Sequence, residues 1–286
     1  MYQRNSENKG LMIKVKKGIR FYIALWGAKL GTILLKLLRR NASFFPGKFA
    51  LKVCPDFIGK IDKPQTIVAV TGTNGKTTVC NMIEDILKDN NFVFIDNKYG
   101  SNIDAGVTTT LINGANFMGK TNKKLAILEV DERSSPKIYP YLTPTYLACT
   151  NLFRDSLMRN AHTEFISEIL TKNIPKETTL ILNGDDLITS NIAPENKRIY
   201  FGIDRLETDG SKCENIARDI IVCPKCNTKL EYDYVRYNHI GRAHCPKCDF
   251  KSPEIDYLGT KMDLNNMKII LKNNEIEEEY DLISDN

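Results

Sequence analysis

The chain of 286 residues lacks a long uninterrupted apolar run, and this absence bears first on whether it crosses a membrane. Its most apolar stretch, residues 19–38, contains Arg20, Lys29 and Lys36. Each charge near the centre of a membrane helix costs about 3 kcal/mol on insertion scales. We therefore expect no membrane span. Because no signal-peptide cleavage pattern follows this stretch, we expect a cytoplasmic protein.

Histidine is also scarce, and neither an internal repeat nor a low-complexity tract is present. The three histidines are His162, His239 and His244, and none is expected to be a ligand. The chain has eight cysteines, but a cytoplasmic location argues against a disulfide framework. Its length and ordinary composition indicate a globular protein of one large or two modest domains.

Charge is distributed unevenly along the chain. Residues 1–60 carry a net charge of +11, whereas the remainder carries −6. We interpret residues 1–60 as a basic helical segment with one amphipathic helix, because apolar and basic residues gather on different faces. The apolar positions are Leu30, Ile33, Leu34, Leu37 and Leu38, and the basic ones are Lys29, Lys36 and Arg40. The apolar face would either dock on the protein body or contact the inner, anionic surface of the membrane.

Residues 61–286 alternate short apolar runs with amphipathic segments of helical length. The runs occupy residues 66–70, 125–130, 145–151, 179–183 and 198–203. Helices are expected at residues 77–90 and 163–173. This alternation predicts an α/β fold, with a mostly parallel sheet covered by helices on both faces.

A loop poor in packing groups, VTGTNGKTTV at residues 70–79, joins the first run to the first helix. A strand-to-helix turn of this kind aims backbone N–H groups at one point, where the helix N-terminus adds positive charge. Lys76 would reach the β- and γ-phosphates of a nucleotide, and the Thr77 hydroxyl would bind Mg²⁺. The alternative is an incidental glycine-rich turn. The expected phosphate-binding residues are Gly72, Thr73, Asn74, Gly75, Lys76, Thr77 and Thr78.

The general phosphate loop has a further glycine where this chain has Val70. The variant TGTNGKTT resembles the ATP loop of the Mur ligase superfamily, whose members join an amine to a carboxylate through an acyl phosphate. Further stretches resemble its MurT branch, the ligase subunits of lipid II isoglutaminyl synthases. These stretches are residues 45–56, 100–111, 128–132 and 150–159, together with a four-cysteine insertion. The resemblance implies a Mur ligase central ATPase domain at residues 61–286, without the C-terminal ligase domain of the family.

The resemblance also implies an activity. ATP would phosphorylate the α-carboxylate of D-glutamate in lipid II, and ammonia would then displace phosphate to leave D-isoglutamine. No Cys-His glutaminase site is recognisable, so a GatD-like glutaminase subunit is implied as the partner in a heterodimer. Two alternatives stay open, a nucleotide-binding module without turnover and a Mur-type ligase for a soluble folate or UDP-linked peptide.

Residues outside the loop gain roles from the same resemblance. Glu129 ends the run at residues 125–130 and would bind Mg²⁺ with Thr77, since Mg²⁺ prefers hard oxygen ligands. Lys76 and Glu129 are thus expected to be catalytic. Asp131 and Glu132 are expected to lie outside the ligand shell or in solvent.

Five further positions are less specific. The family has an acidic residue near a second metal, followed by an Asp-Arg pair; Asp155 and Arg159 match this pattern and are expected to be catalytic. Alternatively, Asp155 caps the N–H groups at a helix start. Asn183 matches the position that contacts adenine, although Asn-Gly-Asp-Asp is also ordinary turn chemistry. Thr108 and Thr109 lie in what reads as a short polar loop that could bind phosphate.

Two Cys-Pro-Lys-Cys knuckles, separated by eighteen residues, have the spacing of a single tetrahedral zinc site. Four thiolates leave no open coordination position, so we expect a structural Zn²⁺. The predicted ligands are Cys223, Cys226, Cys245 and Cys248, within a zinc ribbon inserted at residues 223–250. Few basic residues cluster there, so we expect no binding of nucleic acid.

Overall fold

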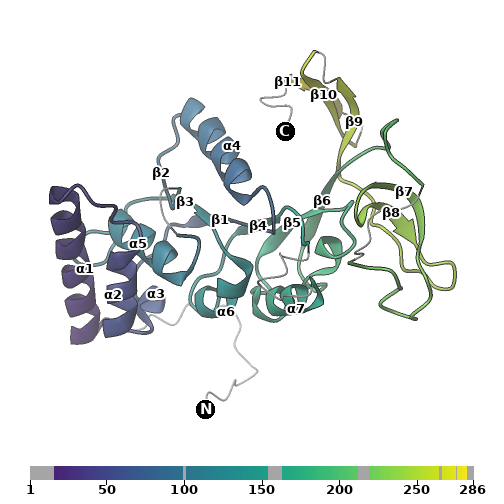
Figure 1. The fold of residues 1–286 in the computed structure, drawn as a ribbon. Helices are drawn as coiled ribbons and strands as arrows, with labels where there is room; N and C mark the ends of the chain where they lie inside the picture. The colour runs from purple at the N-terminus through teal and green to yellow at the C-terminus, as the bar shows by residue number, and fades with distance from the viewer. Residues whose placement is uncertain are drawn as a thin grey trace.

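The computed structural model describes residues 16–98, 101–153, 163–211, 219–263, 266–274 and 276–281. Nine strands form one sheet in the order β11-β10-β9-β6-β5-β4-β1-β3-β2 (Figure 1). Neighbouring strands are parallel from β2 to β9, and antiparallel from β9 to β11. The predicted α/β fold with a mostly parallel sheet is therefore confirmed.

All five apolar runs form strands in the parallel part of the sheet. They are β1 (Thr66–Thr71), β3 (Leu125–Glu129), β4 (Tyr146–Cys149), β5 (Thr179–Asn183) and β6 (Arg198–Ile203). An additional edge strand, β2 (Phe94–Asp96), has three residues and was not expected. Along β1, Ile67 and Ala69 join one buried cluster and Val68 and Val70 the other, which is why the run is apolar throughout.

Helices cover both faces of this sheet (Figure 1). On one face α4 (Lys76–Asp89) packs against β1 and β3. On the other face lie α5 (Asp104–Gly114), the short α6 (Ser135–Ile138) and α7 (Thr163–Asn173). Two 3-10 turns, η1 (Glu132–Ser134) and η2 (Thr189–Asn191), follow β3 and β5.

The N-terminal segment forms three helices beside α5. They are α1 (Ile19–Leu37), α2 (Phe45–Val53) and α3 (Phe57–Lys60). The face of α1 that docks carries Phe21, Ala24, Leu25 and Ala28, all fully buried. The expectation that α1 docks through its leucine-rich face is therefore wrong. Leu30, Leu34 and Leu37 are exposed, whereas the small alanines on the buried face allow close packing on α2. Among the described helices, none has the length and apolar character needed to span a bilayer.

After β6 the chain leaves the sheet and builds a separate two-stranded sheet from β7 (Glu231–Tyr237) and β8 (Ile240–His244). It then returns as β9 (Tyr257–Asp263), which pairs in parallel with β6. The β7–β8 unit has a small buried cluster of its own, which includes Leu230 and Phe250. The chain continues through β10 (Lys268–Asn273) and β11 (Ile276–Asp281).

Candidate functional site

The predicted phosphate loop connects β1 to α4 through backbone conformations that glycine favours. Gly75 is the N-cap of α4 with φ of 81°, and it has no side chain to cap the first N–H groups of the helix. Gly72 has φ of 125°, and a Cβ there would lie 2.2 Å from the Thr150 hydroxyl oxygen. Both positions therefore require glycine. The first turn of α4 is left open to an anion.

The segment after β4 holds this loop in place. The backbone N–H of Thr73 donates to the Asn151 carbonyl at 2.8 Å, and that of Asn74 donates to the Asn151 side chain at 3.0 Å. The Thr150 hydroxyl donates to the Asn74 carbonyl at 2.6 Å, and the Thr73 hydroxyl accepts from the Phe153 N–H at 2.9 Å. These contacts fix the conformation of the loop without a ligand. The backbone N–H of Asn74 is used in one of them, so it is not an open donor.

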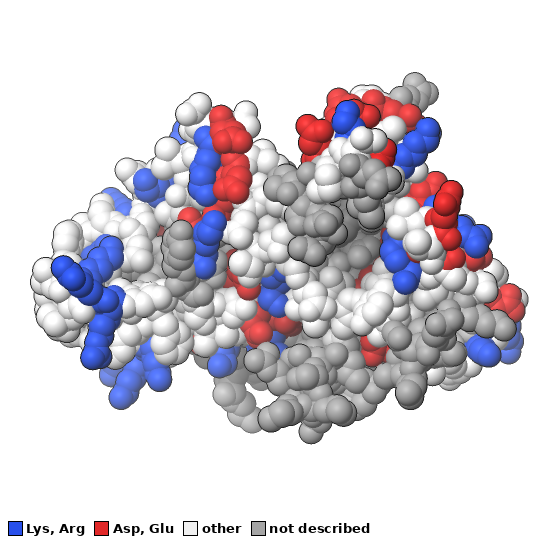
Figure 2. Space-filling model, turned by 45° about the horizontal axis from the view of Figure 1, so that its top comes forward, with Lys and Arg blue, Asp and Glu red and all other residues white. Residues whose placement is uncertain are grey.

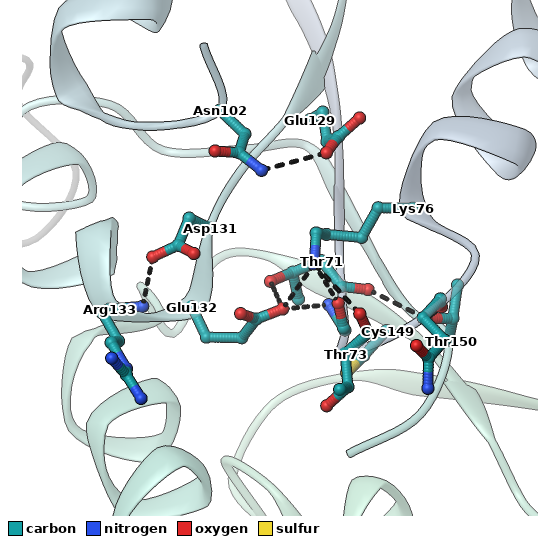
Figure 3. Close-up of polar contacts among 12 residues, drawn as sticks. Thr71, Thr73, Lys76, Asn102, Glu129, Asp131, Glu132, Arg133, Cys149 and Thr150 are labelled. Atoms are coloured by element: carbon teal, nitrogen blue, oxygen red, sulfur yellow. Dashed lines mark hydrogen bonds and ion pairs between the residues drawn. The ribbon is translucent and has the colours of Figure 1, made fainter. Parts of the chain in front are cut away.

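Lys76 is folded back over the loop (Figure 3). Its ammonium donates to the Gly72 carbonyl and lies 3.4 Å from the Glu132 carboxylate. The same carboxylate oxygen accepts from the Gly72 N–H at 2.7 Å and the Thr71 hydroxyl at 3.3 Å. Glu132 is buried behind the loop rather than in solvent, and it positions both the loop backbone and Lys76. The sequence signal that could have identified it was only its place just after β3.

Thr77 and Glu129, the expected magnesium pair, lie side by side. The Thr77 hydroxyl donates to one Glu129 carboxylate oxygen at 2.7 Å, and the Asn102 side chain donates to the other at 3.0 Å (Figure 3). Asn97 exchanges two hydrogen bonds of 2.8 Å with the Glu129 backbone. A hydroxyl and a carboxylate beside a phosphate loop are the hard oxygen donors that Mg²⁺ takes from protein. The donor set fits the ion, and Asn97 and Asn102 are supporting residues that we did not predict.

Asp131 has a different role from Glu129. Its carboxylate accepts from the Arg133 N–H at 3.0 Å and so caps the η1 turn. Figure 3 shows this contact separate from the contacts among Lys76, Thr71 and Glu132. Asp131 therefore supports the chain after β3 without joining those contacts.

Asn183 joins the end of β5 to the end of β4. Its side-chain amide donates to the Thr150 carbonyl at 3.0 Å, and its oxygen accepts from the Asp185 N–H at 3.0 Å. These contacts are those of a structural turn, and the adenine contact stays a prediction. Asp155 and Arg159 lie outside the described residues.

Thr108 and Thr109 do not lie in a polar loop, so that prediction is wrong. Both are buried in α5, and their hydroxyls donate to the carbonyls of Asp104 and Ala105 at 2.7 and 2.9 Å. The Thr109 oxygen also accepts from the Gly47 N–H at 2.9 Å, where a Cβ on Gly47 would clash with the α5 backbone. Thr109 therefore packs α2 against α5, and neither hydroxyl is available to phosphate.

The four predicted zinc ligands converge. The sulfurs of Cys223, Cys226, Cys245 and Cys248 all lie within 4.8 Å of one another, with three of the separations between 3.4 and 3.6 Å. Tetrahedral zinc with Zn–S bonds of about 2.3 Å places its sulfurs about 3.8 Å apart, so the cluster has the right size. The N–H groups of Lys225 and Lys247 each point to a cysteine sulfur at 3.4 Å, which stabilises thiolates. Zinc would close this ribbon as a structural ion.

Buried charges tie the ribbon to the turn after β5. His239 lies between the carboxylates of Asp186, at 3.0 Å, and Asp219, at 3.4 Å. Burial lowers the pKa of His239, but these carboxylates outweigh it and raise the pKa to about 9. The second Asp186 oxygen accepts from the Leu152 N–H at 2.8 Å, next to the segment that holds the phosphate loop. Arg236 makes a parallel connection to Asp185 at 3.2 Å.

Comparison with known proteins gives three findings. The family description "Mur ligase middle domain" matches residues 70–222. The MurT subunit of lipid II isoglutaminyl synthase (glutamine-hydrolyzing) from Staphylococcus aureus strain COL is 33% identical over 250 residues, which cover 86% of this chain and 55% of that protein. The MurT subunit of Streptococcus pneumoniae is 32% identical over 242 residues, covering 84% and 53%. The chain thus spans about half the length of the curated relatives it matches.

Solved structures show the same fold. The UDP-N-acetylmuramoylalanyl-D-glutamyl-2,6-diaminopimelate–D-alanyl-D-alanyl ligase of Acinetobacter baumannii superposes with a TM-score of 0.51 and 16% identity. The match covers 82% of this chain and 42% of that ligase. The resemblance read from the sequence is therefore confirmed at the level of family and fold.

Proposed function

The chain belongs to the Mur ligase family, and from this premise we propose that it is the ligase subunit of an enzyme that amidates lipid II. The reaction would convert the α-carboxylate of D-glutamate to the amide of D-isoglutamine. The proposal is supported by the likeness to MurT subunits over most of the chain. The observation that carries it is the pairing of Thr77 with Glu129 beside Lys76.

In the first step, a carboxylate oxygen of the substrate attacks the γ-phosphorus of ATP, and ADP leaves. Lys76 exchanges its contacts with the Gly72 carbonyl and Glu132 for the transferring phosphoryl group, whose negative charge it stabilises. The open N–H groups at the start of α4 hold the phosphates. Thr77 and Glu129 would hold Mg²⁺, which neutralises phosphate charge when bound.

In the second step, ammonia attacks the carbonyl carbon of the acyl phosphate. Phosphate leaves with the electron pair of the broken C–O bond, and the nitrogen loses a proton to give the amide. Ammonia is mostly protonated at neutral pH, so we propose that a glutaminase partner, GatD-like, delivers it unprotonated within a heterodimer. The protein needs no nucleophile of its own.

The wider arrangement is part of the same proposal. Residues 1–60 would form a basic helical segment, residues 61–286 the ATP-binding domain, and residues 223–250 a zinc ribbon within that domain. Because lipid II resides in the membrane, the chain would work at the inner face of the membrane, as a peripheral protein.

Mass spectrometry of lipid II tests the function. Incubation with the chain, ATP, Mg²⁺, glutamine and a GatD-like glutaminase should give the small mass decrease of acid-to-amide conversion. Lys76→Met should reduce the rate by about 10²- to 10³-fold. Lys88→Met is the matched control, since Lys88 lies exposed near the other end of α4. MgATP binding without conversion would instead indicate a nucleotide-binding module. Turnover with a soluble carboxylate alone would indicate another Mur-type ligase.

A further inference from the structure

The outward face of α1 is apolar along its whole length. Six side chains on it are between 51% and 76% exposed, namely Ile23, Trp26, Leu30, Ile33, Leu34 and Leu37. They recur every three or four residues, apart from the adjacent pair Ile33 and Leu34, so they form one stripe. The stripe lies opposite the buried side of the helix, which carries Phe21, Ala24, Leu25 and Ala28.

A helix at the edge of a domain normally has one apolar face and one polar face. Because α1 is apolar on both, its outer face requires an explanation that packing among the described residues does not supply. The apolar surface also extends past the helix, since the Trp26 indole N–H donates to the Phe117 carbonyl at 2.9 Å. The Phe117 and Met118 side chains beside it are exposed. The exposed apolar surface thus continues from α1 onto residues 117–118.

The charge around this face is mostly positive, although Asp62 lies beside Lys17 at its edge. Residues 16–55 contain nine Lys and Arg and no Asp or Glu. Arg20, Lys36, Arg39 and Arg40 are exposed along α1 and at its end. In Figure 2 the end of the molecule formed by α1 carries blue side chains among white ones, and red ones begin further along. Lys29 differs, because its ammonium donates to the Ile112 and Ala115 carbonyls.

We propose that this face docks on an anionic lipid surface, with α1 lying flat in the interface. The apolar stripe would enter the boundary between headgroups and acyl chains, and the flanking cations would contact lipid phosphates. A helix of 19 residues offers about 28 Å of such contact. The inference deepens the proposed function by specifying how the chain reaches a membrane-bound substrate.

Charge argues against two other occupants. A second copy of the chain would bring two uncompensated positive faces together, which like-charge repulsion disfavours. Residues 1–15 contain three Lys and Arg and one Glu, so they too are net positive. A partner protein with an acidic, apolar groove is the remaining alternative, and the experiment below distinguishes it.

Flotation with vesicles tests the proposal without ATP or lipid II, so its failure is separate from failure of the amidation. The chain should bind phosphatidylglycerol–phosphatidylcholine vesicles at least about tenfold more tightly than pure phosphatidylcholine vesicles. The double variant Leu30→Glu and Leu34→Glu should reduce that binding at least about tenfold. Met82→Glu with Ile86→Glu is the matched control, because it places the same charges at the same spacing on exposed positions of α4. This control should bind like the unaltered chain.

A second variant separates charge from apolar contact. Arg39→Gln with Arg40→Gln should weaken binding to anionic vesicles by about fivefold for each charge removed, and leave neutral vesicles unaffected. Circular dichroism and MgATP binding confirm that each variant is folded. The proposal is overturned if the folded chain does not float with anionic vesicles, or if the leucine double variant floats equally well. It is also overturned if that variant instead abolishes self-association in sedimentation or binding to the glutaminase.

Discussion

The four-cysteine ribbon and the loop between β1 and α4 treat their polar groups in opposite ways. In the ribbon, buried and partly buried charged groups meet counter-charges, as His239 meets Asp186 and Arg236 meets Asp185. In the phosphate loop, Gly75 leaves the first turn of α4 uncapped, and the Thr77 hydroxyl is exposed. The ribbon is closed and the loop is open. Changes in the ribbon should therefore alter the free energy of unfolding, and changes in the loop should alter nucleotide affinity.

Loss of the metal should have the largest effect. Cys245→Ser removes one of four ligands, and structural zinc in small domains contributes on the order of 10 kcal/mol. Native mass spectrometry should show the loss of one Zn²⁺, and hydrogen exchange should show lost protection across residues 219–252. Cys80→Ala, a buried cysteine on α4, is the control and should retain zinc. Unchanged protection in zinc-free Cys245→Ser protein would contradict the closed character of the ribbon.

Removing the buried cation comes next. His239→Gln leaves Asp186 and Asp219 buried without their charged partner, which should destabilise the fold by about 3–5 kcal/mol. Urea unfolding measures this change. His244→Gln is the matched control, because His244 is about half exposed and should change stability by less than about 1 kcal/mol. Equal changes in the free energy of unfolding for the two substitutions would contradict a stabilising role for buried His239.

The same pair predicts a pH dependence. The pKa of His239, about 9 in the folded chain, is above its ordinary value of 6.5. Its stabilisation is therefore fully present below pH 6.5 and is lost as pH rises to 9, a change on the order of 3 kcal/mol. Urea midpoints at pH 6, 7.5 and 9 should fall for the unaltered chain relative to His239→Gln. Parallel curves for the two proteins would overturn the assignment of charge to His239.

A substitution of Glu129 tests the proposed magnesium site beside the phosphate loop most directly. Glu129→Gln keeps the shape of the side chain but removes the charge beside Thr77. The Mg²⁺ concentration needed for half-maximal ATP binding should rise at least about tenfold, with little change in the free energy of unfolding. Asp131→Asn is the matched control, since Asp131 caps η1 and not the ion. Calorimetry of MgATP binding gives the answer, and equal effects of both changes would reject the magnesium assignment.

The smallest effect should come from backbone strain in the loop. Gly75→Ala meets no atom within 4 Å, so its cost arises only from φ of 81° and should be about 1–2 kcal/mol. MgATP affinity should fall by about fivefold or more, because the loop relaxes away from its binding shape. Gly18→Ala, at φ of −83° and also unhindered, should leave affinity unchanged.

Local sequence signals predicted the parallel sheet, the strand-to-helix turn at residues 70–79 and the cysteine cluster well. Each depends on short-range patterns, such as the apolar run of β1 or the spacing of Cys223 and Cys226. The Thr77–Glu129 contact also followed, because parallel strands end at one edge of the sheet. What the sequence did not predict depends on long-range contacts. Glu132 behind the loop and His239 between two carboxylates have no local signature.

The N-terminal helix and the last strands illustrate the same limit. Both faces of α1 are apolar, so helical spacing alone did not identify which face docks. β11 is exposed on both faces and shows no alternation, yet Lys272 of β10 faces Glu277 across the pair. Cross-strand charges and pairing stabilise this edge, and neither is visible until β9 and β10 are placed.

Parallel neighbours in a sheet are usually joined by a crossover helix, which packs onto the sheet and places the second strand beside the first. Between β6 and β9 the connecting segment contains the four-cysteine ribbon instead. With Zn²⁺ bound as we propose, the pairing of β9 with β6, and with it the placement of β10 and β11, would depend on a metal ion in this segment. Zinc supply during synthesis would then decide whether these three strands, a third of the sheet, assemble.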